Sequence, residues 1–351
     1  CDTLLMTDGS GLFLAGPALV KAAIGQSVSS EDLGGAAMHA AVSGTVDFHE
    51  PDDAACIARI REVVARTGAS EKASFSRVAP ADPLYDSDDL YGIFPSNPLG
   101  QYDVREVLAR VVDASDFTEF RPEYGRTIVC GYARLGGWAV GIVANQKIHF
   151  REKGRPMEIG GVIYVESANK AARFILDCHQ QRIPLLFLHD VNGFMVGRDS
   201  EHAGIIRAGA KMVNAVSNVG VPKITLILGG SFGAGHYAMC GKAYTPRLIY
   251  AWPTAKYSVM GGDQAANTLL DIRVAQLQKN GQALGDKEKQ DLLEDIKKRY
   301  ADATDPKYGA ARLWLDAIVD PVDTRRWLIR ALDAAGHNPE VPPLGVGVFQ
   351  T

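Results

Sequence analysis

The strongest constraint on the fold is an apolar run at residues 223–228, KITLIL, followed at once by the small residues GGSFGAG at 229–235. This pattern predicts a buried strand, a tight turn and then a helix. Small residues let backbone amides approach a bound atom closely. The amides of Ala234 and Gly235, with Gly233 in the turn, would then form an oxyanion hole at the positive end of that helix. A turn that binds nothing has the same pattern, and both interpretations stay open.

Residues 229–233 also match the G-x-S-x-G pattern, in which a serine at a strand-to-helix turn is the nucleophile of an α/β-hydrolase. Under this alternative Ser231 attacks the substrate, and a histidine further along the chain is its base. His337 is the only histidine after His236, and it follows an expected helix. No acidic residue between them stands out as the third member of a triad.

Composition narrows the class of protein. The chain has 351 residues, a net charge of −4 and 46% hydrophobic residues. It has no apolar run of the roughly 18–20 residues that span a bilayer, and no basic stripe for nucleic acid. Its five cysteines are scattered without a C-x-x-C pair, which indicates reduced thiols and no structural zinc. We expect a globular protein that binds neither nucleic acid, membrane nor metal.

Strands and helices alternate around the glycine-rich turn. The expected strands are residues 127–135 and 138–144, a hairpin around Gly136-Gly137, then 184–189 and 223–228. The expected helices are residues 51–66, 103–110, 167–180 and 203–219, with a polar linker at 70–89. This alternation predicts an α/β fold in layers.

A unit of two short strands followed by a helix occurs twice in the sequence. Strands at 3–7 and 12–15 precede a helix opened by Gly16-Pro17, and strands at 248–252 and 256–260 precede a helix after Gly261-Gly262. A repeated plan predicts a duplicated domain. By the same offset, the twin of the 233–235 turn would precede Cys1, so we expect the first domain to be incomplete.

A second loop follows the strand at 184–189. Ligands collect at the carboxyl ends of parallel strands, so Val191, Asn192, Gly193 and Phe194 are expected to face the same pocket as residues 229–235. The preceding His189 and Asp190 are candidate acid–base groups. An aspartate at a strand end more often caps the following turn, with the histidine structural.

Stretches along nearly the whole chain resemble the carboxyltransferase (β) subunits of biotin-dependent acyl-CoA carboxylases, of the methylcrotonoyl-CoA and geranyl-CoA branch. The similar stretches are residues 31–36, 103–110, 141–145, 193–197, 209–213, 221–230, 251–253, 258–262, 311–314 and 318–321.

The resemblance implies two crotonase-like (ClpP/crotonase) domains of repeated ββα units: residues 1–78, a linker at 79–102, and residues 103–351. It implies carboxyl transfer from carboxybiotin, on a biotin carboxylase/biotin carrier α subunit, to a coenzyme A thioester. A branched α,β-unsaturated acyl-CoA such as 3-methylcrotonoyl-CoA is the expected substrate. A homo-oligomer of dimers within a hexamer is also implied, in the cytoplasm (favoured) or the mitochondrial matrix.

The resemblance also implies roles for residues. The amides of Ala234 and Gly235, beside Gly233, would hold the biotin ureido oxygen. Val191, Asn192, Gly193 and Phe194, with Gly261 and Gly262, would bind substrate or cofactor, and residues 113–142 would help line the acyl-CoA pocket. The thioester oxyanion hole would precede Cys1, which leaves a non-catalytic assembly fragment as a further alternative. Chemistry carried by backbone amides needs no conspicuous acid–base pair.

Overall fold

The computed structural model describes residues 3–66, 75–97, 100–152, 154, 156–279, 285–338 and 340–345. The chain forms two compact units, Cys1–Ser70 and Glu71–Thr351. Cys1 and residues 70–74 of the predicted linker lie outside the described residues. Within residues 79–102, Leu90 and Tyr102 are buried in the core of the second unit. The assignment of both units to carboxyltransferase domains stays a prediction.

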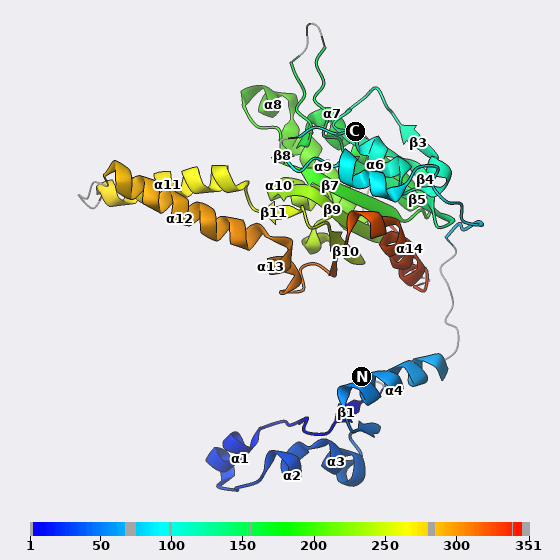
Figure 1. Cartoon of the computed structure of the whole chain (residues 1–351), viewed down its shortest axis with the longest axis vertical. Coiled ribbons are helices and arrows are strands. Elements are labelled where there is room, and N and C mark those ends of the chain that lie inside the picture. The colour runs from blue at the N-terminus through cyan, green and yellow to red at the C-terminus, as the bar shows by residue number, and fades with distance from the viewer. Residues whose placement is uncertain are drawn as a thin grey trace. The chain divides into compact units, whose positions relative to one another are not determined.

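The second unit is built on an eight-stranded sheet in the order β12-β10-β9-β7-β5-β4-β3, with β11 also paired to β9 (Figure 1). Strands β12 to β5 pair in parallel, and β5, β4 and β3 pair antiparallel. Its strands are β3 (Phe117–Phe120), β4 (Ile128–Leu135), β5 (Trp138–Asn145), β7 (Leu185–Val191), β9 (Lys223–Phe232), β10 (Leu248–Ala251), β11 (Lys256–Ser258) and β12 (Ala317–Ile318). A separate parallel pair joins β6 (Val162–Ile163) to β8 (Gly193–Phe194).

Helices cover both faces of this sheet, as the sequence predicts. Leu185 and Phe187 of β7 pack with α7 (Val165–Gln180) and α9 (Ile205–Asn218). Leu186 and Leu188 point the other way, toward α6 (Val104–Ala109) and α14 (Thr324–Ala335). Successive strand residues face opposite sides, so an apolar run is what a strand buried on both faces requires.

The predicted hairpin of β4 and β5 is confirmed. Gly136 and Gly137, between the strands, have φ values of 60° and 81°. Positive φ at both turn residues matches the twist of the strands, and glycine adopts it without steric cost.

Three predicted element boundaries are wrong. β9 continues through Gly229 and Gly230 to Phe232, because Lys256–Ser258 of β11 pairs with its end. Residues 12–15 form no strand; only an isolated bridge joins Gly11 to Gly35 there, so the ladder that would extend a strand is missing. The predicted helix at 203–219 is divided at Gly204, which has a φ of 88°.

The two units share a parallel strand pair followed by a helix. In the first unit β1 (Leu5–Thr7) pairs with β2 (Phe48–Glu50), and α4 (Asp53–Arg66) follows. In the second unit β10 pairs with β12, and α14 follows. This correspondence is not the predicted one, which needs a strand at residues 12–15 that does not form. The other helices of the first unit are α1 (Pro17–Ile24), α2 (Ser30–Gly34), α3 (Ala36–Met38) and the π-helical turn η1 (His39–Ser43).

Two long helices, α11 (Gly262–Lys279) and α12 (Asp286–Thr304), lie side by side and project from the sheet, and α12 contacts β11 and α13 (Pro306–Ala310) (Figure 1). The hydroxyl of Tyr300 on α12 hydrogen-bonds to Ser258 at 2.8 Å and so fixes α12 to β11. The second unit also has the short helices α5 (Leu90–Ile93), α8 (Arg198–Ala203) and α10 (Gly233–Ala238), and the 3-10 turns η2 (Ser87–Asp89), η3 (Asp113–Ser115), η4 (Lys242–Tyr244) and η5 (Pro321–Asp323). Among the described residues, no helix is both long and apolar enough to cross a membrane.

Candidate functional site

The end of β7 meets the start of α10, which follows β9 without an intervening loop. Gly233 turns the chain with a φ of 55°, and α10 begins there. A Cβ placed on Gly235 would lie 2.7 Å from Cγ2 of Val191 and 3.1 Å from Cα of Gly193. Gly235 therefore has no room for a side chain. The structure brings together the two loops that the sequence predicts to share a pocket.

Two cavities flank this junction. One, of about 290 Å³, is lined by Gly233, Ala234, His236, Tyr237 and residues 257–259. The other, of about 450 Å³, is lined by residues that include Asn192, Gly229, Gly230, Phe232, Lys147, Lys256, Gly261 and Gly262. The predicted site residues thus divide between two cavities. Val191, Gly193, Phe194 and Gly235 line neither of these two cavities, unlike the single shared pocket that the sequence predicts, and Gly235 packs against Val191 and Gly193.

The amides at the start of α10 have no partner within the helix itself. The first four N–H groups of any helix lack a partner within the helix. Ala234 is exposed, and it lines the smaller cavity. Gly233 also lines this cavity, whereas Gly235 is buried and lines neither cavity. A ligand oxygen in the smaller cavity could accept a hydrogen bond from the amide of Ala234.

Asp190 lies at the end of β7, where the pairing with β9 shifts register. It is 4% exposed, and its carboxylate accepts hydrogen bonds from Lys147 Nζ at 2.7 Å, the Gly230 amide at 2.9 Å and the Tyr102 hydroxyl at 3.1 Å. Burial, and then the Asp190 charge, raises the pKa of Tyr102 well above its usual value. Asp190 therefore binds the neighbouring strand β9 rather than capping the turn that follows β7. Its carboxylate oxygens already accept three hydrogen bonds, which makes it poorly suited to act as a base.

Ser231 lies between two histidines. Its hydroxyl is 2.8 Å from Nδ1 of His189 and 2.8 Å from Nδ1 of His236. Nε2 of His189 faces the carbonyl of Met239. Ser231 and His189 are both 0% exposed. The histidine beside Ser231 is therefore not His337, the partner that the hydrolase alternative needs, and a fully buried hydroxyl is badly placed to attack a substrate.

Both histidines are held uncharged. Burial, and then the nearby His236, lowers the pKa of His189 to about 3, and burial lowers the pKa of His236 to about 4. In the unfolded chain both side chains titrate with a pKa of about 6.5.

The free energy of unfolding should therefore fall as the pH falls from about 6.5 to about 4. In this range the two histidines bind protons in the unfolded chain but stay uncharged in the native state. Each histidine contributes at most about 1.4 kcal/mol per pH unit. Urea denaturation at fixed pH values checks this. His236→Asn should reduce the slope of the unfolding free energy against pH by about the contribution of one histidine. An unchanged slope in that variant would show that His236 does not have a lowered pKa in the native state.

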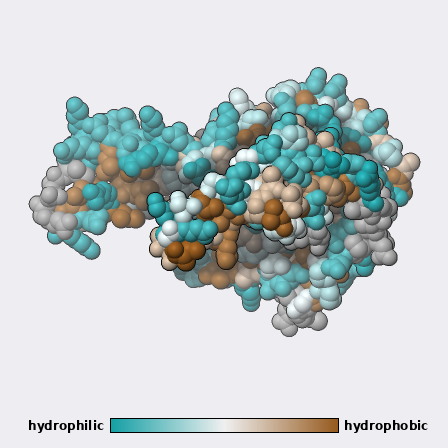
Figure 2. Space-filling model, turned by 90° about the horizontal axis from the view of Figure 1, so that it is seen from below, coloured by the Kyte–Doolittle hydropathy of each residue, from teal (hydrophilic) through white to brown (hydrophobic). Residues whose placement is uncertain are grey.

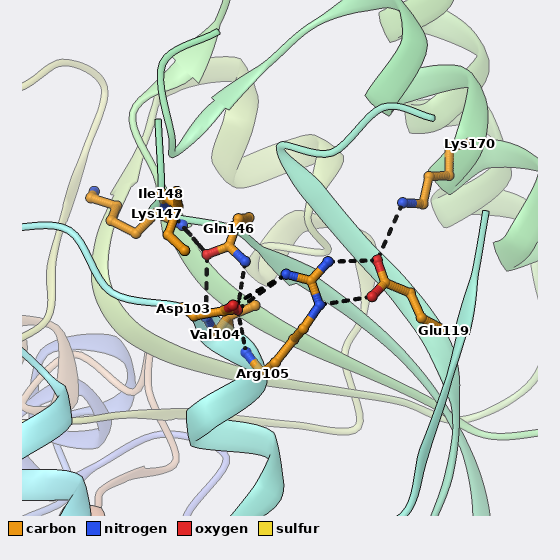
Figure 3. Close-up of polar contacts among 8 residues, drawn as sticks. All are labelled: Asp103, Val104, Arg105, Glu119, Gln146, Lys147, Ile148 and Lys170. Carbon is orange, nitrogen blue, oxygen red and sulfur yellow. Dashed lines mark hydrogen bonds and ion pairs between the residues drawn. The ribbon is translucent and has the colours of Figure 1, made fainter. Parts of the chain in front are cut away.

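A network of ion pairs and hydrogen bonds holds the segment that carries Lys147 (Figure 3). The Gln146 side chain accepts from the amides of Val104 at 3.2 Å and Lys147 at 2.9 Å, and it donates to Asp103 at 2.7 Å. Arg105 binds Glu119 through two hydrogen bonds, of 2.8 and 3.0 Å. This network and Lys147 were missed at the sequence level, because no local motif marks them.

Lys170, at the edge of this network, is 0% exposed, and its Nζ lies 3.9 Å from Oε1 of Glu119. Among the described residues this ammonium makes no hydrogen bond, and burial lowers its pKa. A buried charge without good partners costs more than an apolar side chain of similar size.

We expect Lys170→Met to leave the free energy of unfolding unchanged or to raise it by about 1 kcal/mol. Glu119→Gln is the matched comparison, and it should lower the free energy by about 2 kcal/mol because it weakens the charged hydrogen bonds from Arg105. Urea denaturation of both variants tests this. Equal destabilisation by both changes would show that the Lys170 ion pair is stabilising.

Parallel strands whose glycine-rich ends meet over a short helix, in repeated strand and helix units, define a crotonase-like protein. The chain belongs to the carboxyl transferase domain family, whose model matches residues 1–345. It is 43% identical over 349 residues to the biotin-dependent 3-methylcrotonyl-coenzyme A carboxylase beta1 subunit of Mycobacterium tuberculosis, covering 99% of this chain and 63% of that relative.

Solved structures agree with this assignment. The P. aeruginosa geranyl-CoA carboxylase beta subunit matches with a TM-score of 0.75 and 38% identity, covering 100% of this chain and 62% of that one. The hexameric transcarboxylase 12S core matches with a TM-score of 0.66 and 33% identity, covering 100% of this chain and 64% of that one. The chain thus spans less than two thirds of the length of these proteins.

Proposed function

We propose that this chain transfers a carboxyl group from carboxybiotin to an acyl-CoA, with a branched α,β-unsaturated acyl group such as 3-methylcrotonoyl preferred. The observation that carries the proposal is the match of the carboxyl transferase family over residues 1–345. The substrate follows from the names of the relatives, a 3-methylcrotonyl-coenzyme A carboxylase subunit and a geranyl-CoA carboxylase subunit. Biotin would reach the site on a separate biotin carrier subunit.

The residues at the junction fit a ureido group. Ala234 and Gly233 line the smaller cavity, of about 290 Å³, and Gly233 has no side chain to cover the backbone there. Bound there, carboxybiotin would supply the carboxyl group. The amides of Ala234 and Gly235 would hold its ureido oxygen and stabilise negative charge on it. Asn192, Gly261 and Gly262, in the larger cavity, would contact the acyl-CoA.

Exposed hydrophobic residues support a homo-oligomer. In the first unit Leu14, Leu19 and Ile24 are 108%, 62% and 73% exposed, and in α11 Ile272 is 59% exposed. Figure 2 shows hydrophobic residues gathered in patches among hydrophilic ones. Large exposed apolar patches mark interaction surfaces. The related transcarboxylase 12S core assembles as a hexamer, which favours a hexamer here as well.

The test uses the native protein, a carboxylated biotin carrier with a radiolabelled carboxyl group, and a panel of acyl-CoA thioesters. We expect label in the acyl-CoA fraction, with the highest kcat/KM for 3-methylcrotonoyl-CoA among acetyl-, propionyl-, 3-methylcrotonoyl- and geranoyl-CoA. Label transfer to none of them would contradict the proposal. A stable oligomer without transfer would instead favour the non-catalytic assembly role.

The serine hydrolase remains a second candidate only because a histidine nitrogen lies 2.8 Å from the Ser231 hydroxyl. A nucleophilic serine should react with a fluorophosphonate probe. We expect no labelling of Ser231 in the folded protein, measured by mass spectrometry, because this side chain is fully buried. Labelling that Ser231→Ala abolishes would support the hydrolase.

A further inference from the structure

Helix α10 is too short to be stable or to keep a fixed orientation without contacts to the rest of the protein. It has six residues, Gly233–Ala238, and an isolated helix of this length is unstable in water. Its first turn carries the amides to which the proposed function gives a role. The rest of the protein must therefore fix the helix, and the contacts of His236, in its middle, show how.

The hydrogen bonds around Ser231 permit only one arrangement of protons when both histidines are neutral. The Met239 carbonyl can only accept, so Nε2 of His189 carries the hydrogen. Nδ1 of His189 then accepts from the Ser231 hydroxyl, 2.8 Å away. The serine has no second hydrogen, so Nδ1 of His236 must donate to it across 2.8 Å. The resulting chain runs in one direction, from His236 through Ser231 and His189 to Met239.

This chain ties the helix to the sheet at two places. His236 lies within α10 and Met239 is its C-cap, whereas Ser231 lies on β9 and His189 on β7. The His236 ring is also confined on its sides. It stacks on Tyr257 with ring centroids 6.0 Å apart, and it lies so close to Gly241 that a Cβ there would overlap its edge. The helix can neither roll about its axis nor slide along it without breaking a buried hydrogen bond.

We propose that His189, Ser231 and His236 form a positioning relay that sets the direction of the Ala234 and Gly235 amides. This role of the amides rests on the proposed function, whereas the anchoring of α10 does not. Ser231 and His189 are fully buried and touch no substrate, and His236, which borders the smaller cavity, enters this scheme only through its hydrogen bond to Ser231. They act through the backbone of α10, where a misplacement of about 1 Å costs about a hundredfold in rate. The serine of the G-x-S-x-G pattern thus has a use other than nucleophilic attack.

Ser231→Ala removes the centre of the relay in the native protein. We expect kcat for carboxyl transfer to fall about 10- to 100-fold, with KM for the acyl-CoA changed less than about twofold. Ser217→Ala, on the exposed side of α9, makes the same chemical change away from the relay and should leave both constants unchanged. His236→Asn keeps an N–H donor close to the position of Nδ1 and should retain most of the activity. His236→Leu has no hydrogen-bond donor at this position and should lose most of the activity.

Hydrogen exchange measured by mass spectrometry tests the anchoring without an activity assay. The peptide covering residues 233–241 should exchange faster in Ser231→Ala and His236→Leu than in the parent protein, Ser217→Ala or His236→Asn. If the parent transfers no carboxyl group, the proposed function fails and the exchange pattern still decides the relay. If Ser231→Ala does not fold, the two His236 variants decide it. Equal exchange and equal kcat in His236→Asn and His236→Leu would overturn the relay.

Discussion

Replacing Ala234 by proline should lower kcat for carboxyl transfer by about 100- to 1000-fold, equivalent to about 3–4 kcal/mol of barrier. Proline removes the amide hydrogen at 234 that the proposed function directs at the ligand. Ala234 is the second residue of α10, where a helix needs no N–H and proline's fixed φ is tolerated. Because Ala234 is exposed, the proline ring meets little of the core. Steady-state kinetics on the native protein measures the effect.

Ala234→Ser is the matched control, because it adds a small side chain and keeps the amide. It should stay within about threefold of the parent in kcat, since only the donor matters under this scheme. Gly235 is the poorer position for the test. A side chain there meets Val191 and Gly193, so its substitution would disturb packing as well as the amide. A folded Ala234→Pro variant with parental kcat would show that this amide does not take part.

Replacing Asp190 by alanine should lower the free energy of unfolding by about 3–5 kcal/mol. The change leaves the Lys147 ammonium, 6% exposed at its side chain, without its counter-ion. It also removes the acceptor of the Tyr102 hydroxyl and of the Gly230 amide. An uncompensated buried charge is more costly than the absence of the whole pair. Urea denaturation gives the free energy.

The double variant Lys147→Met with Asp190→Ala should recover part of that loss, because no charge is then left unpaired. Lys147→Met alone should also destabilise, since it leaves the carboxylate with two neutral donors. The three variants and the parent form a double-mutant cycle that isolates the energy of the ion pair. A cycle that is additive within about 0.5 kcal/mol would mean that the two side chains do not interact appreciably.

The sequence by itself determined the secondary-structure elements that depend only on residue type and on the spacing of neighbouring residues along the chain. Positive φ at Gly136 and Gly137 follows from residue type, and the buried strands and the helical course of α9 follow from the spacing of apolar residues. The turn into α10 and the meeting of the two loops also followed from glycine positions and the order of strands. Resemblance along the chain identified the family, which the match over residues 1–345 confirms.

Only the tertiary structure decided the polar contacts that support the junction. β9 runs on through Gly229 and Gly230 because β11, more than twenty residues later, supplies hydrogen-bond partners. Asp190 meets Lys147 and Tyr102 across separations of 43 and 88 residues, and Ser231 meets His189 across 42. Local preferences carry no information about such partners. Which buried polar groups satisfy one another depends on strand order and register, and these exist only once the sheet has formed.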